Sequence, residues 1–177
     1  MSEAETPVKS RLSVGRIINI AIIVLVVGWL MLRIISPYQP TTFAGVRPDN
    51  LGINATGQLA PCPSTPNCVN SQSQNSEHYI EPYIIKSARP WDILVKIVED
   101  SYGSRIIANT GDYLYAEFTT KIMGFVDDVE FVRDEANQHI DVRSASRMGE
   151  SDLGTNRKRL ETIRNRFDDL NQEVSQS

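Results

Sequence analysis

The sequence predicts an α+β fold: one N-terminal transmembrane helix, then a mostly antiparallel sheet with two helices packed on one face, in the order β-α-β-β-β-β-α. An uncharged apolar run covers residues 17–32. Four short segments rich in aromatic and β-branched residues follow one another between residues 104 and 144, with turn residues between them. Apolar residues recur at helical spacing on either side of these segments. Strands that follow one another directly favour an antiparallel sheet, and helices outside them favour two layers.

The apolar run is the first element. With Arg33 near its end it continues to Ile35, which is close to the roughly 20 residues that a helix needs to cross a bilayer. A buried core helix is the alternative, but so long an apolar run with so little patterning favours a membrane span. We therefore predict a transmembrane anchor over residues 16–35.

The flanking charges predict the orientation of this anchor. Lys9, Arg11 and Arg16 lie before or at its start, and few basic residues follow it closely. The positive-inside rule then predicts residues 1–15 as a cytoplasmic tail and everything after the anchor on the far side of the membrane. A cleaved signal peptide is the alternative, although its apolar region is usually only about 7–15 residues long.

Residues 36–76 are rich in Pro, Gly, Ser, Thr, Asn and Gln, and we predict a linker that becomes a proline-rich loop. This loop contains the two cysteines of the chain, Cys62 and Cys68. In an oxidising compartment such a pair is most simply a disulfide, and two free thiols are the alternative. Because the cysteines are not spaced as C-x2-C and the chain has only two histidines, we predict no metal site and no cofactor.

The compact domain is predicted over residues 77–173. Its elements are an edge strand interrupted by Pro82, a helix that starts at residue 87 or 89 and ends at residue 100, and a last helix. Strands are expected between the helices at residues 104–109, 113–119, 125–133 and 138–144. The last helix is expected over residues 156–171, with Thr155 or Asn156 as its N-cap.

The last two strands also suggest a register. Closing their hairpin over residues 134–137 puts Phe131 beside Ile140 and Asp128 opposite Arg143. Asp127 then lies on the core side, where a carboxylate needs a partner. Arg147 or the backbone amides of residues 149–154 would supply it.

Asp127, Asp128 and Asp152 are therefore predicted to act as structural clamps, and a catalytic acid at Asp127 is the alternative.

The segment from residue 141 to residue 159 is unusually polar and basic, and two glycines bracket Ser151 and Asp152. Because it leads into a helix whose amino end is electropositive, it is a candidate anion-binding segment. The candidate ligand-binding residues are Arg143, Arg147, Ser151, Asn156 and Arg157. The ordinary alternative is a solvated helix face with acidic partners at i,i+4 spacing.

Three blocks of sequence resemble one family. LAPCPSTPNCVNSQ, YLYAEFTTKIMGFVDDVEF and VRSASRMGESDLGTNRKRL are similar to the signature blocks of the bacterial and plastid family called domain of unknown function 1499. The resemblance covers residues 59–167. It implies a bacterial inner or thylakoid membrane, and with the orientation predicted from the flanking charges the domain would lie on the periplasmic or lumenal side. The family has no established activity, so the resemblance supports domain limits and adds no mechanism.

Composition narrows the function. The formal net charge is −4, and the part after the anchor is more acidic still, so nucleic acid is not an expected partner. We expect a non-catalytic binding or assembly module, whose partner is another membrane or envelope protein or an anionic headgroup. The alternatives are a hydrolase-type enzyme that uses Asp127, Asp128 or Glu130 with Arg147, and a purely structural role. No G-x-S-x-G, P-loop or Cys-His motif supports an enzyme.

Overall fold

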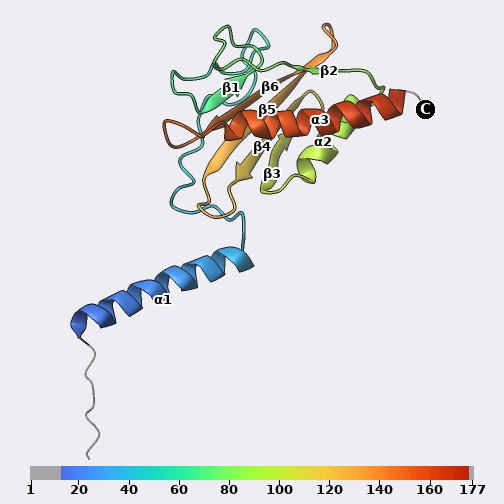
Figure 1. The fold of residues 1–177 in the computed structure, drawn as a ribbon. Coiled ribbons are helices and arrows are strands. Elements are labelled where there is room, and N and C mark those ends of the chain that lie inside the picture. The colour runs from blue at the N-terminus through green and yellow to red at the C-terminus, as the bar shows by residue number, and fades with distance from the viewer. Residues whose placement is uncertain (1–12, 176–177) are drawn as a thin grey trace, which may run out of the picture. The chain divides into compact units, whose positions relative to one another are not determined.

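The structure is a computed structural model that describes residues 13–175 and divides the chain into two units, before and after the Pro37–Tyr38 bond. The first unit contains helix α1, Val14–Ile35 (Figure 1). Ser13 caps it by accepting a hydrogen bond from the Arg16 amide. Among the described residues, α1 is the one helix long and apolar enough to cross a membrane. Most of the predicted cytoplasmic tail, residues 1–12, lies outside the described residues.

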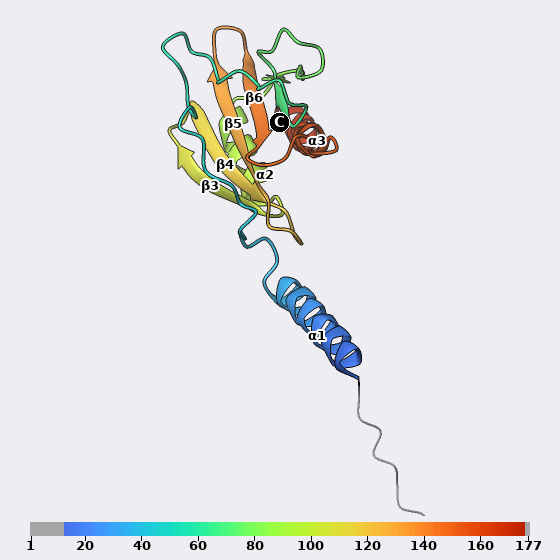
Figure 2. The ribbon, with the colours of Figure 1, turned by 90° about the vertical axis from the view of Figure 1, so that its left-hand side faces the viewer.

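The second unit is a six-stranded antiparallel sheet with two helices on one face (Figures 1 and 2). The predicted α+β class is confirmed. The elements are β1 Cys68–Asn70, β2 Tyr83–Ile84, α2 Pro90–Glu99, β3 Ser104–Asn109, β4 Tyr113–Thr119, β5 Val126–Asp134, β6 His139–Ser146 and α3 Thr155–Ser175. The strand order is β1-β6-β5-β4-β3, and β2 also pairs with β6. The short strand β1 was not predicted, because the prolines around it indicate a loop.

The core lies between the helices and one face of the sheet. Tyr83 is fully buried there, packs between the rings of Phe131 and Phe167, and donates its hydroxyl to the Leu160 carbonyl at 2.6 Å. The other core side chains come mainly from α2, α3, β4, β5 and β6: Leu94, Ile97, Val98, Leu114, Ala116, Phe118, Val129, Ile140, Val142, Leu160 and Ile163. This apolar layer fixes the distance and orientation of α3 over the strands.

The register of the β5–β6 hairpin differs by two residues from the predicted one. Phe131 pairs with Val142 and Glu130 with Arg143, so the predicted pairing of Asp128 with Arg143 is wrong. The reason is the turn, which spans residues 135–138 and holds Gln138 at φ 54°. Because side chains alternate with a period of two, this shift leaves every residue on the face that was predicted.

The opposite face of the sheet is covered by the chain that follows α1. From Tyr38 onward the predicted linker is part of the compact unit, and Figure 2 shows it running along the strands. Phe43 packs on Phe125, and Leu59 is buried. The predicted disulfide between Cys62 and Cys68 is present at 2.04 Å. Both faces of β4, β5 and β6 are therefore largely shielded from water, whereas the edge strand β3 is more open.

Candidate functional site

The sheet face beneath the covering chain holds a cluster of charged side chains, which we call the arginine–carboxylate network. Alternation along β4, β5 and β6 puts these side chains on one face, and the register sets Glu117 opposite Asp128 and Glu130 opposite Arg143. The network consists of Glu117, Asp128, Glu130, Arg47, Arg105, Arg143, Arg147, Tyr113 and Tyr115.

Arg147 lies at the centre of one half of this network. Its Nε donates to both Asp128 oxygens at 3.1 and 3.0 Å, and its Nη2 lies 2.5 Å from Glu117 Oε1. The side chains of Arg147, Glu117 and Asp128 are only 6, 5 and 1% exposed. Tyr115 completes the cluster by donating its hydroxyl to Asp128 at 2.6 Å. An outside anion could reach Arg147 only by breaking these buried pairs.

The other half of the network centres on Glu130. Arg143 donates to one of its oxygens at 3.0 Å, and the Tyr113 hydroxyl and the Gly52 amide donate to the other at 2.8 and 2.7 Å. Glu130 is fully buried and Arg143 nearly so. The Gly52 contact ties the covering chain to the strand, so this half of the network fixes the position of the cover.

The surroundings fix the protonation states of the network. Burial raises the pKa of Glu117, but hydrogen bonds from Arg105, Arg147 and Arg47 outweigh burial and bring its pKa to about 2. Burial, the hydrogen bond to Asp128 and the nearby negative charges raise the pKa of Tyr115. Glu117 therefore stays charged and Tyr115 stays protonated at neutral pH. Neither titrates near neutrality, as a general acid or base usually does.

Asp127 lies on the opposite, core-side face, and its partner is Arg159 of α3. The predicted partners of Asp127, Arg147 and the loop amides, are wrong. Arg147 belongs to the other face of the sheet, so the strands separate it from Asp127. Arg159 also donates to Asn156 Oδ1 at 2.7 Å and lies over the Phe118 ring at 4.9 Å. Asp127 thus clamps α3 to β5.

Asp152 organises the start of α3. Its carboxylate accepts hydrogen bonds from the Gly154 amide at 3.0 Å and the Asn156 amide at 2.7 Å. Asp152 therefore caps the first turn, and the predicted capping role of Thr155 or Asn156 is wrong. The reason is that both residues already lie inside the helix.

Asn156 and Arg157, two of the predicted anion-binding residues, have internal partners. Asn156 is fully buried, and its Nδ2 donates to the Asn67 carbonyl and to Ser146 Oγ, each at 2.9 Å. Arg157 donates to the Tyr79 carbonyl at 2.7 Å and the Glu77 carbonyl at 2.9 Å. Both residues therefore fasten neighbouring chain segments to the start of α3.

Ser151 is exposed, and its Oγ accepts from the Leu153 amide at 3.3 Å. The structure thus distributes the predicted anion site over both faces of the sheet and a surface loop, and does not gather it around one cavity.

A different group of basic residues lines a groove between the end of α2 and α3, which we call the α2–α3 groove. It has a volume of about 500 Å³. Phe118 and Ile163 form an apolar floor. The remaining lining residues are Asp100, Ser101, Tyr102, Thr155, Lys158, Arg159, Thr162 and Arg166.

Lys158 and Arg166 are exposed in this groove and make no side-chain hydrogen bond or ion pair within the described residues. The sequence contains a signal for this arrangement, the i,i+4,i+8 spacing of Lys158, Thr162 and Arg166 on α3. The sequence analysis missed it because it placed the anion site on the segment before the helix and at the helix start, and gave no binding role to Lys158 or Arg166.

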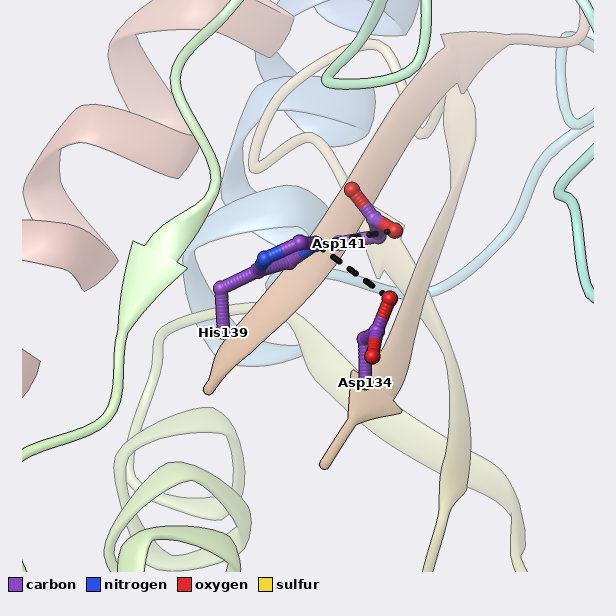
Figure 3. Close-up of side chains that lie close together, drawn as sticks. All are labelled: Asp134, His139 and Asp141. Atoms are coloured by element: carbon purple, nitrogen blue, oxygen red, sulfur yellow. Dashed lines mark ion pairs between the residues drawn. The ribbon is translucent and has the colours of Figure 1, made fainter. Parts of the chain in front are cut away.

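Within residues 13–175, one group of side chains could hold a metal ion: Asp134, His139 and Asp141, at the turn end of the β5–β6 hairpin (Figure 3). His139 Nε2 lies 3.4 Å from Asp141 Oδ2 and 3.9 Å from Asp134 Oδ2. The carboxylates already have donors, since Asp141 accepts from Ser71 and Gln72, both at 2.7 Å, and Asp134 from the Asn137 amide. The sequence did not indicate this cluster, because the hairpin register creates it.

Comparison with curated proteins gives no match, and comparison with solved structures gives none. Residues 58–167 match the family model described as "Protein of unknown function (DUF1499)". The matched region begins at the disulfide loop and ends in α3, so it includes all six strands and α2. It also includes the three carboxylates of the arginine–carboxylate network, Glu117, Asp128 and Glu130, and the Asp127–Arg159 pair. It covers more than half of the chain, and the predicted resemblance is confirmed: the protein belongs to the DUF1499 family.

Proposed function

We propose that the protein is a single-pass membrane protein whose folded domain is a non-catalytic binding or assembly module. The closed arginine–carboxylate network carries this proposal. Asp127, Asp128 and Glu130, the carboxylates considered for catalysis, are 3, 1 and 0% exposed, and each is paired with an arginine. A general acid or base must come within hydrogen-bonding reach of its substrate. These carboxylates hold strands, covering chain and α3 together instead.

Helix α1 and its flanking charges support the proposed location of the module. A helix of 22 residues fits the thickness of a bilayer, and the basic residues before it favour a cytoplasmic N-terminus. A disulfide at Cys62–Cys68 fits an oxidising compartment. We therefore place the domain on the periplasmic or lumenal side of a bacterial inner or thylakoid membrane, with a membrane lipid or another envelope protein as partner.

Fractionation and protease protection of the full chain test this proposal. Expressed in a bacterium with a C-terminal epitope tag, the protein should stay in the membrane pellet after an alkaline carbonate wash. External protease should remove the tag in spheroplasts and leave it in intact cells. A cytoplasmic protein of the same cells, resistant to protease in spheroplasts, is the control. Recovery of the protein in the soluble fraction, or protection of the tag in spheroplasts, would contradict the proposal.

A further inference from the structure

We propose that the α2–α3 groove binds one anionic membrane lipid, with an acyl chain on its apolar floor and the phosphate on Lys158 and Arg166. This inference rests on the proposed function, because it names the partner of the membrane-anchored module. It moves the ligand site from the buried arginines of the network to the exposed cations of α3.

The floor of the groove suits a hydrocarbon chain. Phe118 and Ile163 line the bottom of the groove but are only 4 and 2% exposed, so most of the apolar surface open to the groove belongs to Tyr102 and to the aliphatic stems of Lys158 and Arg166. The Tyr102 ring beside them is 87% exposed. The groove volume of about 500 Å³ lies within the range of ordinary ligand pockets, roughly 300–1,000 Å³. An acyl chain laid along this floor would remove apolar surface of both partners from water.

The rim of the groove suits a phosphate. The one carboxylate that lines it, Asp100, is paired with Lys96 at 2.9 Å, and the third cation, Arg159, is paired with Asp127. Within the part of the chain that the structure describes, Lys158 and Arg166 thus remain as two positive charges without an acidic partner, on a chain whose formal net charge is −4. Thr162 lies between them, but its hydroxyl already donates to the Lys158 carbonyl at 2.8 Å, so the two cations alone would hold the phosphate. Such a rim is complementary to a phosphate group.

Two observations favour a membrane lipid over a soluble anion. A free phosphate would leave the apolar floor in contact with water. In addition, Tyr102 at the groove stacks on Tyr38 with ring centroids 6.2 Å apart. Tyr38 is the first residue of the compact unit and comes only three positions after Ile35, the last residue of α1. A membrane-anchored chain would therefore meet anionic lipids, which carry both a phosphate and acyl chains, at high local concentration.

The test uses the full-length protein in a neutral detergent and counts bound lipids by native mass spectrometry. The probes are phosphatidylglycerol and phosphatidylcholine with the same acyl chains. We expect one phosphatidylglycerol to bind, and phosphatidylcholine to bind much more weakly. The double variant Lys158→Gln/Arg166→Gln should lower the phosphatidylglycerol affinity roughly 10- to 30-fold, since each cation near a lipid phosphate contributes about a factor of five.

The matched control is Lys86→Gln/Arg89→Gln, which removes two exposed positive charges outside the groove. It should leave the affinity unchanged. A third variant, Thr162→Trp, fills the groove from an exposed helix position without changing charge and should also abolish binding. Near-UV circular dichroism identical to that of the unaltered protein shows that each variant is folded.

Three results would overturn the inference: equal binding of both lipids, unchanged affinity in the groove variants, or equal loss in the control variant. Displacement of the lipid by millimolar inorganic phosphate would also overturn it, because the floor would then contribute nothing. A protein that is retained in the membrane but binds no lipid refutes this inference alone. A protein that is not retained in the membrane refutes the proposed function as well.

Discussion

Arg147 shows how the position of a residue in a strand ladder decides what its charge does. Taken from the sequence alone, an arginine beside a glycine-containing loop is a candidate for binding an anion. In the fold it follows β6 on the covered face of the sheet, where Glu117 and Asp128 from two other strands meet it. Its guanidinium therefore joins three strands and is not offered to a ligand.

Removal of this guanidinium should cost much stability. Arg147→Ala leaves Glu117 and Asp128 buried with less compensation, and we expect the free energy of unfolding to fall by about 3–5 kcal/mol. Chemical denaturation of the full chain in a Trp29→Phe background measures it, because Trp91 in the core is then the only tryptophan. The control is Lys96→Ala, which breaks the exposed pair with Asp100 and should cost less than about 1 kcal/mol. Equal effects of the two variants would mean that the network is not a stability element.

Glu117 should make stability depend on acid pH. Its pKa falls from the usual 4.5 to about 2 in the folded protein, because the hydrogen bonds from Arg105, Arg147 and Arg47 outweigh burial. The stabilisation is therefore complete above pH 4.5 and is lost as the pH falls towards 2, by roughly 1–3 kcal/mol. Denaturation curves at a series of pH values measure this loss. In Glu117→Gln, which is less stable throughout, the slope over this pH interval should be smaller.

At the scale of the element, α3 depends on the carboxylate of Asp152. This carboxylate accepts from two amides of the first turn, which have no helical partners of their own. Asp152→Ala should lower the free energy of unfolding by about 1 kcal/mol. Glu150→Ala, an exposed acidic position in the same loop, is the control and should change little. If both variants lose the same amount, loss of negative charge near the helix terminus explains the effect better than capping.

The elements themselves were largely predictable. Strands β3 and β4 begin and end at the predicted residues, because alternation of apolar and polar residues is a local signal. The β5–β6 register was wrong by two residues, since the four-residue turn lies one residue later than predicted, at residues 135–138, where Gln138 adopts a positive φ. Strand β1 was missed because its pairing with β6 is a long-range contact within a proline-rich loop.

The site was less predictable than the fold. Arg47 contacts Glu117 and Gly52 contacts Glu130 from a segment without regular secondary structure. Hydrophobic periodicity gives no information on the path of such a segment, so these contacts could not be predicted. Asp127 was correctly placed on the core side, yet its partner Arg159 required knowledge of where α3 crosses the sheet. Local patterns thus indicate which side chains need partners, while the packing of layers decides which partners they find.

At the scale of the whole molecule, the buried charged side chains of the domain pair mostly with one another. In the α2–α3 groove, by contrast, Lys158 and Arg166 have no acidic partner among the described residues. A closed sheet face with paired carboxylates gives rigidity, and an open groove on the helix side gives a surface for a partner. The proposed lipid site would thus lie on the helix side of the sheet, opposite the arginine–carboxylate network. The disulfide that closes the loop is expected to form in the cell only if the domain is exported to an oxidising compartment.

The disulfide therefore offers a direct measure of topology. In the full chain expressed in a bacterium, Cys62 and Cys68 should react with a maleimide-polyethylene glycol only after denaturation and reduction, because an exported pair is oxidised. Reversing the flanking charges with Lys9→Glu, Arg11→Glu and Arg16→Glu should retain part of the population in the cytoplasm, where the thiols react without reduction. The matched control replaces Glu3 and Glu5 by Gln, which leaves the basic flank intact and should keep the pair oxidised. Free thiols in the unaltered chain would place the domain in the cytoplasm and remove the basis for a lumenal or periplasmic module.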